Sequence, residues 1–345
     1  MPDPPSPPKG GFGATRPPSP PPGRGTDSKP PAAGEVPSDL LSPPDLSPRP
    51  FRAGMVAVVG RPNAGKSTLV NRMVGEKVAI VSDKPQTTRR RVMGVVQSPE
   101  FQVTLVDTPG IHRPDHRMNA SMVRDAVDAL EGCDVVLWVI DASERRGSGD
   151  RHIAELIRRH AAPSLAALNK ADRVSKPALL PQLGELAGLA NFSALVPISA
   201  LTGDGVDELL REVVRLLPEG PALFPGDETT PGSLAEKVAE QIREPALALT
   251  REEVPFSLAV VVDELKTEPD KDLTVVRATL YVEREGQKGI LVGKGGSMIR
   301  EIGSRARASC ESRFGGKFFL DLRVDTHENW REDPSFLARI VNPEV

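Results

Sequence analysis

The octapeptide at residues 60–67 constrains this chain more than any other feature. It reads G-R-P-N-A-G-K-S, which satisfies G-x-x-x-x-G-K-S, and it lies between the apolar run Met55–Val59 and the helical pattern Thr68–Val74. In such a strand–loop–helix unit the glycines let backbone N–H groups close around phosphates at a helix N-terminus. The residues expected to contact a nucleotide are Gly60, Arg61, Pro62, Asn63, Ala64, Gly65, Lys66, Ser67 and Thr68. The Lys66 ammonium is expected to reach the β- and γ-phosphates, and the Ser67 hydroxyl to bind Mg²⁺.

Around this loop the chain alternates apolar strands with amphipathic helices. Nearly continuous apolar runs recur at Met55–Val59, Gln102–Val106, Val135–Ile140, Leu165–Leu168 and Leu195–Ile198. Helical periodicity lies between them, for example at Ile153–Ile157 and Leu209–Leu216. This alternation predicts an α/β domain with a mostly parallel sheet covered by helices on both faces. Ligands of such sheets lie at the carboxyl ends of the strands.

Proline and glycine divide the chain into parts. Residues 1–50 hold 17 of the 35 prolines and are predicted to form a disordered tail, because they cannot bury enough apolar surface to order themselves. The Pro/Gly-rich stretch Leu217–Gly232 predicts a linker at residues 218–233, between domains at 51–217 and 234–345. The second domain is expected to be a small α+β unit, with helices at Leu234–Leu249 and near Pro334–Ile340 and strands at Phe256–Glu264, Leu273–Glu283 and Lys317–Val324.

Composition excludes several classes of protein. The chain has no apolar run long enough to span a membrane and no secretory signal pattern, so a cytoplasmic protein is expected. Cys133 and Cys310 lie far apart and have no metal-binding or redox spacing. A net charge of −3 argues against indiscriminate binding to nucleic acid, so any such partner requires a local basic surface.

The tetrapeptide Asp107-Thr108-Pro109-Gly110 follows the second strand, 40 residues after Ser67. An Asp at that point can hold Mg²⁺ through a water, and the Gly110 N–H can meet the γ-phosphate and respond to its loss. Taken alone the tetrapeptide could be an ordinary turn, but its place on the neighbouring strand favours the functional interpretation. All four residues are therefore expected in the nucleotide site.

A third motif, Asn169-Lys170-Ala171-Asp172, follows the strand Leu165–Leu168. The Asp172 carboxylate can accept the ring N–H and the exocyclic amine of guanine, a pattern that adenine cannot present. Lys170 can cover the base and Asn169 can brace the loop, while Ser199-Ala200 offers a backbone N–H to the guanine carbonyl oxygen. In combination with the two phosphate motifs, this indicates GTP and GDP as the ligands.

A switch segment is expected between the first two motifs, at Gln86-Thr87-Thr88-Arg89. Either threonine could complete the Mg²⁺ shell when a triphosphate is bound, and Thr88 is preferred. The predicted metal ligands are thus Ser67, Thr88 and Asp107.

The implied reaction is attack of water on the γ-phosphorus. The residues predicted to support it are Lys66, Asn63 and Gly110. Ras-like enzymes carry a water-orienting glutamine after the switch glycine, whereas this chain has Ile111. A slow intrinsic rate is therefore expected.

The second domain contains Gly293-Lys294-Gly295-Gly296 between two helical patterns. A G-x-x-G turn of this kind is the KH arrangement, which clamps about four single-stranded nucleotides. From Lys288 to Arg323 there are eight Lys/Arg and three Asp/Glu residues, a local excess that fits contacts along one RNA strand. The predicted RNA contacts are Lys288, Gly293, Lys294, Gly295, Gly296 and Arg300. A solvated basic helix face is the alternative.

Together these motifs resemble the Era family of ribosome-associated GTPases. The resemblance rests on G-R-P-N-A-G-K-S-T, P-Q-T-T-R, D-T-P-G-I-H, N-K-A-D and S-A-L, and on the G-x-x-G turn with Trp330-Arg331 beyond it, over residues 53–345. It implies binding to the 3′ end of small-subunit ribosomal RNA, assistance to 30S maturation and a monomeric state. It also implies that Asn63 could hold a K⁺ ion. The Pro-rich tail and the ending Ile340-Val341 depart from the family pattern.

Two alternatives stay open at this point. The chain could be an RNA-binding assembly module that holds GTP structurally with little turnover. Peripheral contact with the inner face of the cell membrane, through basic residues near Arg305–Lys317, is also undecided.

Overall fold

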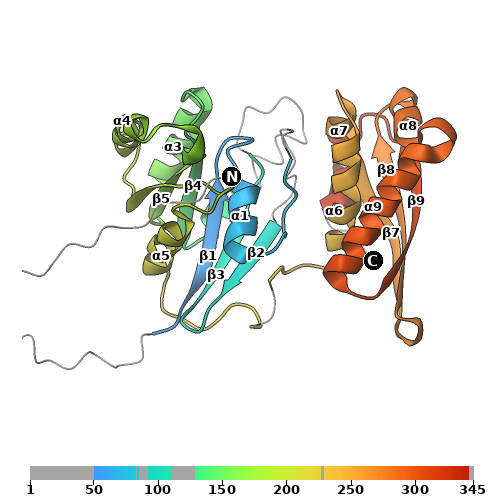
Figure 1. Ribbon diagram of the computed structural model, residues 1–345, viewed down its shortest axis with the longest axis horizontal. Coiled ribbons are helices and arrows are strands. Elements are labelled where there is room, and N and C mark those ends of the chain that lie inside the picture. Colours follow the sequence, from blue (N-terminus) through green and yellow to red (C-terminus); the bar gives the residue numbers. More distant parts are fainter. Residues whose placement is uncertain (1–49, 83, 85–91, 111–128, 227–228, 342–345) are drawn as a thin grey trace, which may run out of the picture. The chain divides into compact units, whose positions relative to one another are not determined.

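The computed structural model describes residues 50–82, 84, 92–110, 129–226 and 229–341. Its first part is a six-stranded sheet (Figure 1) made of β1 (Arg52–Val59), β2 (Val92–Gln97), β3 (Phe101–Asp107), β4 (Val135–Asp141), β5 (Ser164–Asn169) and β6 (Ala194–Pro197). The strand order is β2-β3-β1-β4-β5-β6, and every neighbouring pair is parallel except β2 and β3. The predicted mostly parallel α/β fold is confirmed. The antiparallel edge strand β2 was not predicted.

Helices cover both faces of this sheet (Figure 1). They are α1 (Lys66–Val74), α3 (Ser148–Arg159), α4 (Lys176–Ala187) and α5 (Val206–Leu216), with a 3₁₀ turn η2 (Ala171–Arg173) after β5. Leu69 of α1 and Val213 of α5 belong to one apolar core, and Ile153 of α3 and Leu186 of α4 belong to another on the opposite face. Because both faces are buried, the ends of the strands are where ligands can approach.

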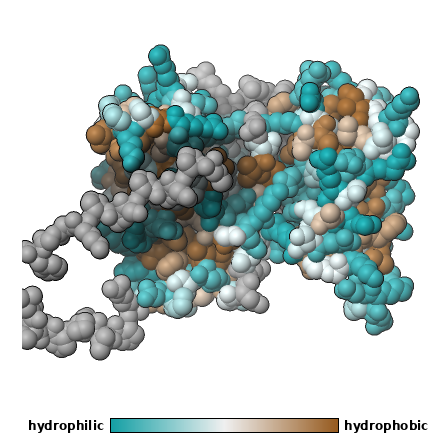
Figure 2. Space-filling model, in the orientation of Figure 1, coloured by the Kyte–Doolittle hydropathy of each residue, from teal (hydrophilic) through white to brown (hydrophobic). Residues whose placement is uncertain are grey.

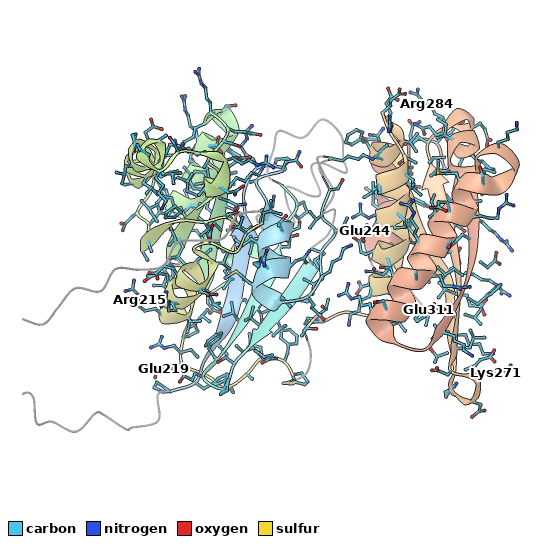
Figure 3. All side chains as sticks on the ribbon, in the orientation of Figure 1. Arg215, Glu219, Glu244, Lys271, Arg284 and Glu311 are labelled. Carbon is cyan, nitrogen blue, oxygen red and sulfur yellow. The ribbon has the colours of Figure 1, made fainter. Side chains whose placement is uncertain are left out.

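The second part is the smaller sheet of β7 (Ala259–Glu268), β8 (Leu273–Val282) and β9 (Lys317–Thr326). The strand β8 is central, antiparallel to β7 and parallel to β9. The accompanying helices are α6 (Leu234–Leu249), α7 (Val254–Ser257), α8 (Glu285–Val292), α9 (Ser297–Phe314) and α10 (Pro334–Val341), with 3₁₀ turns η3 (Pro269–Lys271), η4 (Lys294–Gly296) and η5 (Trp330–Glu332). In Figure 3, Lys271 marks the β7–β8 turn, Arg284 the start of α8 and Glu311 the last turn of α9.

Two apolar cores hold this sheet. Side chains of α6 and α9, including Ile242 and Ile302, pack on one face. Trp330 and Phe336 pack on the other face, where the indole N–H of Trp330 donates to the carbonyl of Ser257 at 2.8 Å. The predicted α+β domain is confirmed, with one difference. The strand expected from Phe256 begins at Ala259, because the residues before it form the short helix α7.

Part of the predicted linker is hydrogen-bonded to the first sheet. The buried Gln102 of β3 accepts the backbone N–H groups of Leu223 (2.6 Å) and Phe224 (3.0 Å) through its Oε1. Arg52 of β1 donates to the Leu217 carbonyl at 2.6 Å and pairs with Glu219 at 3.3 Å. The exact limits of the linker and of the domains stay predictions, and the predicted tail at 1–49 lies outside the described residues.

The visible face of the described residues is largely hydrophilic (Figure 2). The large apolar side chains that are well exposed among them are Val81, Leu180, Leu201, Leu223, Ile290 and Phe319. Within the described ranges no helix combines the length and the apolar character needed to cross a membrane.

Candidate functional site

A cavity of about 430 Å³ lies at the carboxyl edge of the first sheet. Residues from all three predicted nucleotide motifs line it, together with neighbouring loops: Pro62, Asn63, Gly65, Lys66, Ser67, Thr68, Ile80, Val81, Ser82, Lys84, Gly110, Glu144, Asn169, Lys170, Asp172, Arg173, Ala200 and Leu201. The volume falls within the range of small-molecule sites. The structure thus brings together residues up to 139 positions apart in the sequence.

The phosphate loop requires glycine at two positions. Gly60 has φ +156°, and a Cβ there would lie 2.3 Å from the carbonyl oxygen of Val139. Gly65 has φ +95°, and a Cβ there would lie 2.2 Å from Nδ2 of Asn169. Both contacts are far shorter than real Cβ atoms tolerate, so any larger residue would displace the loop. Helix α1 begins directly after Gly65, which directs its N-terminal N–H groups into the cavity region.

Lys66 is buried beneath the loop that it follows. Its ammonium donates to the carbonyl oxygens of Gly60 (3.2 Å) and Arg61 (3.0 Å). Burial lowers the pKa of Lys66, and the nearby Asp107 carboxylate opposes that shift. A buried cation held against the loop carbonyls is suited to an anionic ligand, because phosphate oxygens would offset its desolvation.

Ser67 and Asp107 meet beside this ammonium. The Ser67 hydroxyl donates to Oδ2 of Asp107 at 2.7 Å, and the Asp107 side chain is fully buried at the end of β3. A hydroxyl and a carboxylate at this spacing are the hard oxygen donors that Mg²⁺ prefers, so the donor set fits the predicted metal. Thr88, the third predicted ligand, lies outside the described residues, as does Ile111.

The residues after Asp107 have different surroundings. The hydroxyl of Thr108 donates to the carbonyl of Val58 at 2.8 Å, which fastens β3 to β1, and Thr108 is buried. Gly110 lies against the phosphate loop, because a Cβ there would be 2.7 Å from the backbone nitrogen of Pro62. Of the tetrapeptide, only Gly110 lines the cavity, so a direct nucleotide contact by Thr108 or Pro109 stays a prediction.

Asn169 joins the phosphate loop to the loop that follows β6. Its Nδ2 donates to the carbonyl of Ala64 at 2.8 Å, and its Oδ1 accepts the backbone N–H of Ala200 at 2.9 Å. The side chain is buried at the end of β5. Asn169 therefore braces two loops, as its place in the motif suggested.

Lys170 and Asp172 turn toward the cavity from η2. Lys170 has left-handed backbone geometry (φ 62°), and its ammonium pairs with Oδ2 of Asp141 at 2.5 Å. Burial raises the pKa of the Asp141 carboxyl, but hydrogen bonds from Lys170 and Ser143 outweigh that effect, and the net pKa is lowered. Asp172 is exposed and lines the cavity, and its carboxylate makes no hydrogen bond to another residue of the described ranges.

The backbone donors predicted for the guanine oxygen are already engaged. The Ser199 N–H donates to the carbonyl of Asp204 at 2.8 Å, and the Ala200 N–H donates to Asn169. The next N–H, that of Leu201, has no acceptor in the part of the chain that the structure describes, and Leu201 lines the cavity. Leu201 therefore joins Ser199 and Ala200 as a candidate donor.

Arg61 does not turn its side chain into the cavity. Its guanidinium pairs with Asp150 of α3 at 3.3 Å and with Glu144 at 3.4 Å. Asp150 is buried, and its carboxylate also accepts the N–H of Gly147 at 2.8 Å. The Arg61 side chain thus fastens the phosphate loop to the start of α3, and its nucleotide contact is expected through the backbone only.

In the second domain the G-x-x-G turn forms η4 between α8 and α9. Gly293, Gly295 and Gly296 all have positive φ, at 71°, 58° and 78°. A Cβ at Gly293 would lie 2.8 Å from the backbone nitrogen of Met298, whereas the space beside Gly295 is open. The turn therefore exposes backbone at Gly295, which is the feature that close approach of an RNA backbone requires.

The basic side chains predicted to contact RNA around this turn differ in whether a carboxylate of the described residues already pairs with them. Lys294 is exposed and has no ion pair within the described ranges, while Arg300 donates to the carbonyl of Gly295 at 2.8 Å. Lys288 instead pairs with Asp325 of β9 at 3.1 Å. Further along α9, arginines pair with glutamates one turn away, Arg305 with Glu301 and Arg307 with Glu311. The uncompensated positive charge near the turn is thus concentrated at Lys294 and Arg300.

Comparison with known proteins agrees with both halves of this description. A family profile described as "50S ribosome-binding GTPase" matches residues 55–170, and one described as "KH domain" matches residues 253–331. GTPase Era of Geobacter metallireducens is 43% identical over 295 residues, which cover 86% of this chain and 99% of the relative. The chain belongs to the Era family of GTPases. GTPase Era of Heliobacterium modesticaldum is 41% identical, over 83% of this chain and 96% of its own length.

Solved structures of Era extend the comparison. Aquifex aeolicus Era bound to GDP·AlF₄⁻ is 39% identical, with a TM-score of 0.81 over 84% of this chain and 99% of the other. Era in complex with MgGDPNP and nucleotides 1506–1542 of 16S ribosomal RNA is 40% identical, with the same TM-score over 84% and 98%. The family resemblance given by the motifs is therefore confirmed.

Sequence reasoning missed several residues of the site. Asp141, which holds Lys170, ends β4 and carries no motif of its own. Leu201 was seen only as the third letter of S-A-L. Glu144 and Arg173 line the cavity from turns that the sequence did not distinguish. The position of Asp141 at the end of a buried strand was the one signal that could have indicated it.

Proposed function

We propose that this Era-family GTPase binds GTP and Mg²⁺ in the cavity described above. In this proposal the phosphate loop and Lys66 hold the β- and γ-phosphates, Ser67, Asp107 and Thr88 hold the metal, and Asp172 reads guanine. Bound Mg²⁺ would supply positive charge to the γ-phosphate oxygens. The observation that carries the proposal is the Ser67–Asp107 hydrogen bond at the start of α1, near the buried Lys66 ammonium that the loop carbonyls hold. The GDP and MgGDPNP bound in the two related Era structures support the same ligands.

We further propose that the turn at residues 293–296 binds the 3′ end of small-subunit ribosomal RNA, with Lys294 and Arg300 at phosphates. The exposed Gly295 backbone and the free charge of Lys294 support this, as does the related complex with 16S ribosomal RNA. Lys288 is a weaker contact, because RNA must compete with Asp325 for its ammonium. The GTP-bound and GDP-bound states would then differ in affinity for RNA or for the 30S subunit, with the chain acting as a cytoplasmic monomer in subunit maturation.

Slow hydrolysis with K⁺ at Asn63 is the finer part of the proposal. Asn63 is exposed and lines the cavity from the phosphate loop, with φ 62°. A cation there would add positive charge near the γ-phosphate, where the chain has Ile111 in place of a glutamine. Equal turnover in K⁺ and Na⁺, or a K⁺ response unchanged by Asn63→Ala, would end this part of the proposal.

Phosphate release with and without 30S subunits distinguishes a GTP-hydrolysing switch from a module that holds GTP structurally. A rate increased by subunits supports the switch, and absence of release under both conditions supports the structural module. Crosslinking of GTP-loaded protein to cellular RNA tests the clamp through Gly295→Asp and its matched control Gly295→Asn. Both side chains tolerate the left-handed backbone and the space is open, so only the negative charge differs. Loss of the ribosomal 3′-end crosslink in the Asp variant alone supports the clamp, and an unchanged crosslink opposes it.

A further inference from the structure

Arg72 makes an unusual pair of contacts on the first domain. It lies on α1, one turn and a half beyond Lys66, and its guanidinium reaches the loop after β6. Its Nε donates to the carbonyl of Ala200 at 3.2 Å, and its Nη2 donates to the carbonyl of Leu201. Within the described ranges it has no ion pair with a carboxylate. The charged guanidinium thus donates to two consecutive backbone carbonyls.

The first of these carbonyls, that of Ala200, determines the direction of a neighbouring donor. In a trans peptide the C=O and the following N–H point in opposite directions across one rigid plane. By holding the Ala200 carbonyl toward α1, Arg72 directs the Leu201 N–H away from α1. That N–H is the one donor of the Ser199–Thr202 turn without an acceptor among the described residues, since the Thr202 N–H donates to the Ser199 hydroxyl at 3.2 Å.

The guanidinium of Arg72 also lies against the rest of the turn. Gly203 has φ +99°, and a Cβ there would be in ordinary contact with the guanidinium at 3.8 Å. The turn is closed by the Gly203 N–H, which donates to the Ser199 carbonyl at 2.8 Å. Asn169 holds the first residues of the turn, but no described side chain except Arg72 holds the Leu201 carbonyl.

We propose that Arg72 is a positioning residue for guanine recognition. It fixes the Ala200–Leu201 peptide so that the Leu201 N–H meets the carbonyl oxygen of the base, while Asp172 accepts the ring N–H and the exocyclic amine beside it. Because Arg72 and the phosphate-binding Lys66 share helix α1, the same short helix sets both ends of the nucleotide. This inference rests on the proposed guanine site.

The test compares GDP with 6-thio-GDP, in which sulfur replaces only the oxygen that Leu201 would read. Sulfur is a weak hydrogen-bond acceptor, so the wild-type protein is expected to bind GDP more tightly. Arg72→Ala is expected to reduce that preference about fivefold, toward equal affinity, since one hydrogen bond is loosened. The preference for GDP over IDP reports the guanine amine at Asp172, and it should be unchanged.

Two further variants complete the test, one as a matched control and one as a conservative substitution. Arg211→Ala removes an exposed arginine of α5 that pairs only with Glu208 in the described structure, and both preferences should stay at wild-type values. Arg72→Lys keeps the charge and the helix but lacks the planar fork, so it should lose part of the sulfur discrimination and carries the test if the Ala variant does not fold.

The possible outcomes distinguish failure of the role proposed for Arg72 from failure of the proposed guanine site. A GDP preference over 6-thio-GDP that is unchanged in both Arg72 variants would overturn the inference, as would a wild-type protein indifferent to the sulfur. A wild-type protein that does not prefer GDP to ADP would instead overturn the guanine site itself.

Discussion

Replacing Asn169 by Ala removes the brace between the phosphate loop and the guanine-side turn. The change deletes two buried hydrogen bonds, to the Ala64 carbonyl at 2.8 Å and from the Ala200 N–H at 2.9 Å. It leaves both backbone groups without their partner. Each buried group so orphaned is worth about 1–3 kcal/mol. Water entering from the adjacent cavity would recover part of this, so we expect the free energy of unfolding to fall by about 2–4 kcal/mol.

The effect on binding follows from what the brace connects. In the proposed site the two loops touch opposite ends of the nucleotide, so after the brace is removed the ligand must restore their spacing when it binds. If about 1.4 kcal/mol of the loss is recovered from binding, affinity for GDP falls about tenfold. Titration calorimetry with GDP measures this, and urea denaturation measures the stability change.

The control is Asn191→Ala, the same chemical change at an exposed position whose side chain has no hydrogen bond to another described residue. It should leave GDP affinity and stability within experimental error of wild type. Affinity for GDP within twofold of wild type in Asn169→Ala would refute the reasoning, because it would show that the two loops keep their spacing without the brace.

Three further predictions rest on other contacts. Asp141→Asn should remove stability that wild type has in full above about pH 3.8 and loses as pH falls through the lowered pKa of Asp141. Wild-type and variant unfolding midpoints should therefore converge as the pH falls below 3.8, and a constant difference would contradict this. Burial raises the pKa of Cys310 to about 12, so a thiol reagent at pH 8 should label Cys310 only after unfolding, and rapid labelling of native protein would exclude that burial. Gly293→Ala should lower the thermal midpoint and RNA affinity more than Gly295→Ala, because only the former meets Met298 at 2.8 Å, and equal effects in melting and filter-binding assays would count against the geometry of the turn.

The sequence predicted the site best where its residues belong to motifs with fixed spacing along the chain. The three nucleotide motifs each follow a strand, so a correct reading of the strands also placed Lys66, Asp107 and Asp172 at one edge of the sheet. The edge strand β2 was missed, because Val92–Gln97 is a short apolar run of the kind that periodicity alone cannot assign. The small domain was recognised from its turn, although its first strand begins three residues later than expected.

Contacts between distant segments could not be predicted in the same way. Lys170 and Asp141 are 29 residues apart, and their pairing depends on β4 and β5 being neighbours in register. Lys288 was counted as free positive charge, yet the parallel pairing of β8 with β9 brings Asp325 to it. Arg72 lies on an exposed helix face, where an arginine is ordinarily taken as solvated surface. In each case the missing information was which strands and helices adjoin.

These contacts also explain why polar side chains rather than apolar ones hold the site together. The ends of parallel strands leave backbone carbonyls and N–H groups that no ladder satisfies, and a buried group of that kind requires a partner. Lys66 bonds two carbonyls of the phosphate loop, Arg72 links helix α1 to the loop after β6, and Asn169 joins those two loops. An apolar side chain could fill the same space but would fix neither the direction of a carbonyl nor that of the N–H behind it. Phosphate and guanine recognition require oriented backbone donors, so in the proposed site the residues that stabilise these loops also contribute to its selectivity.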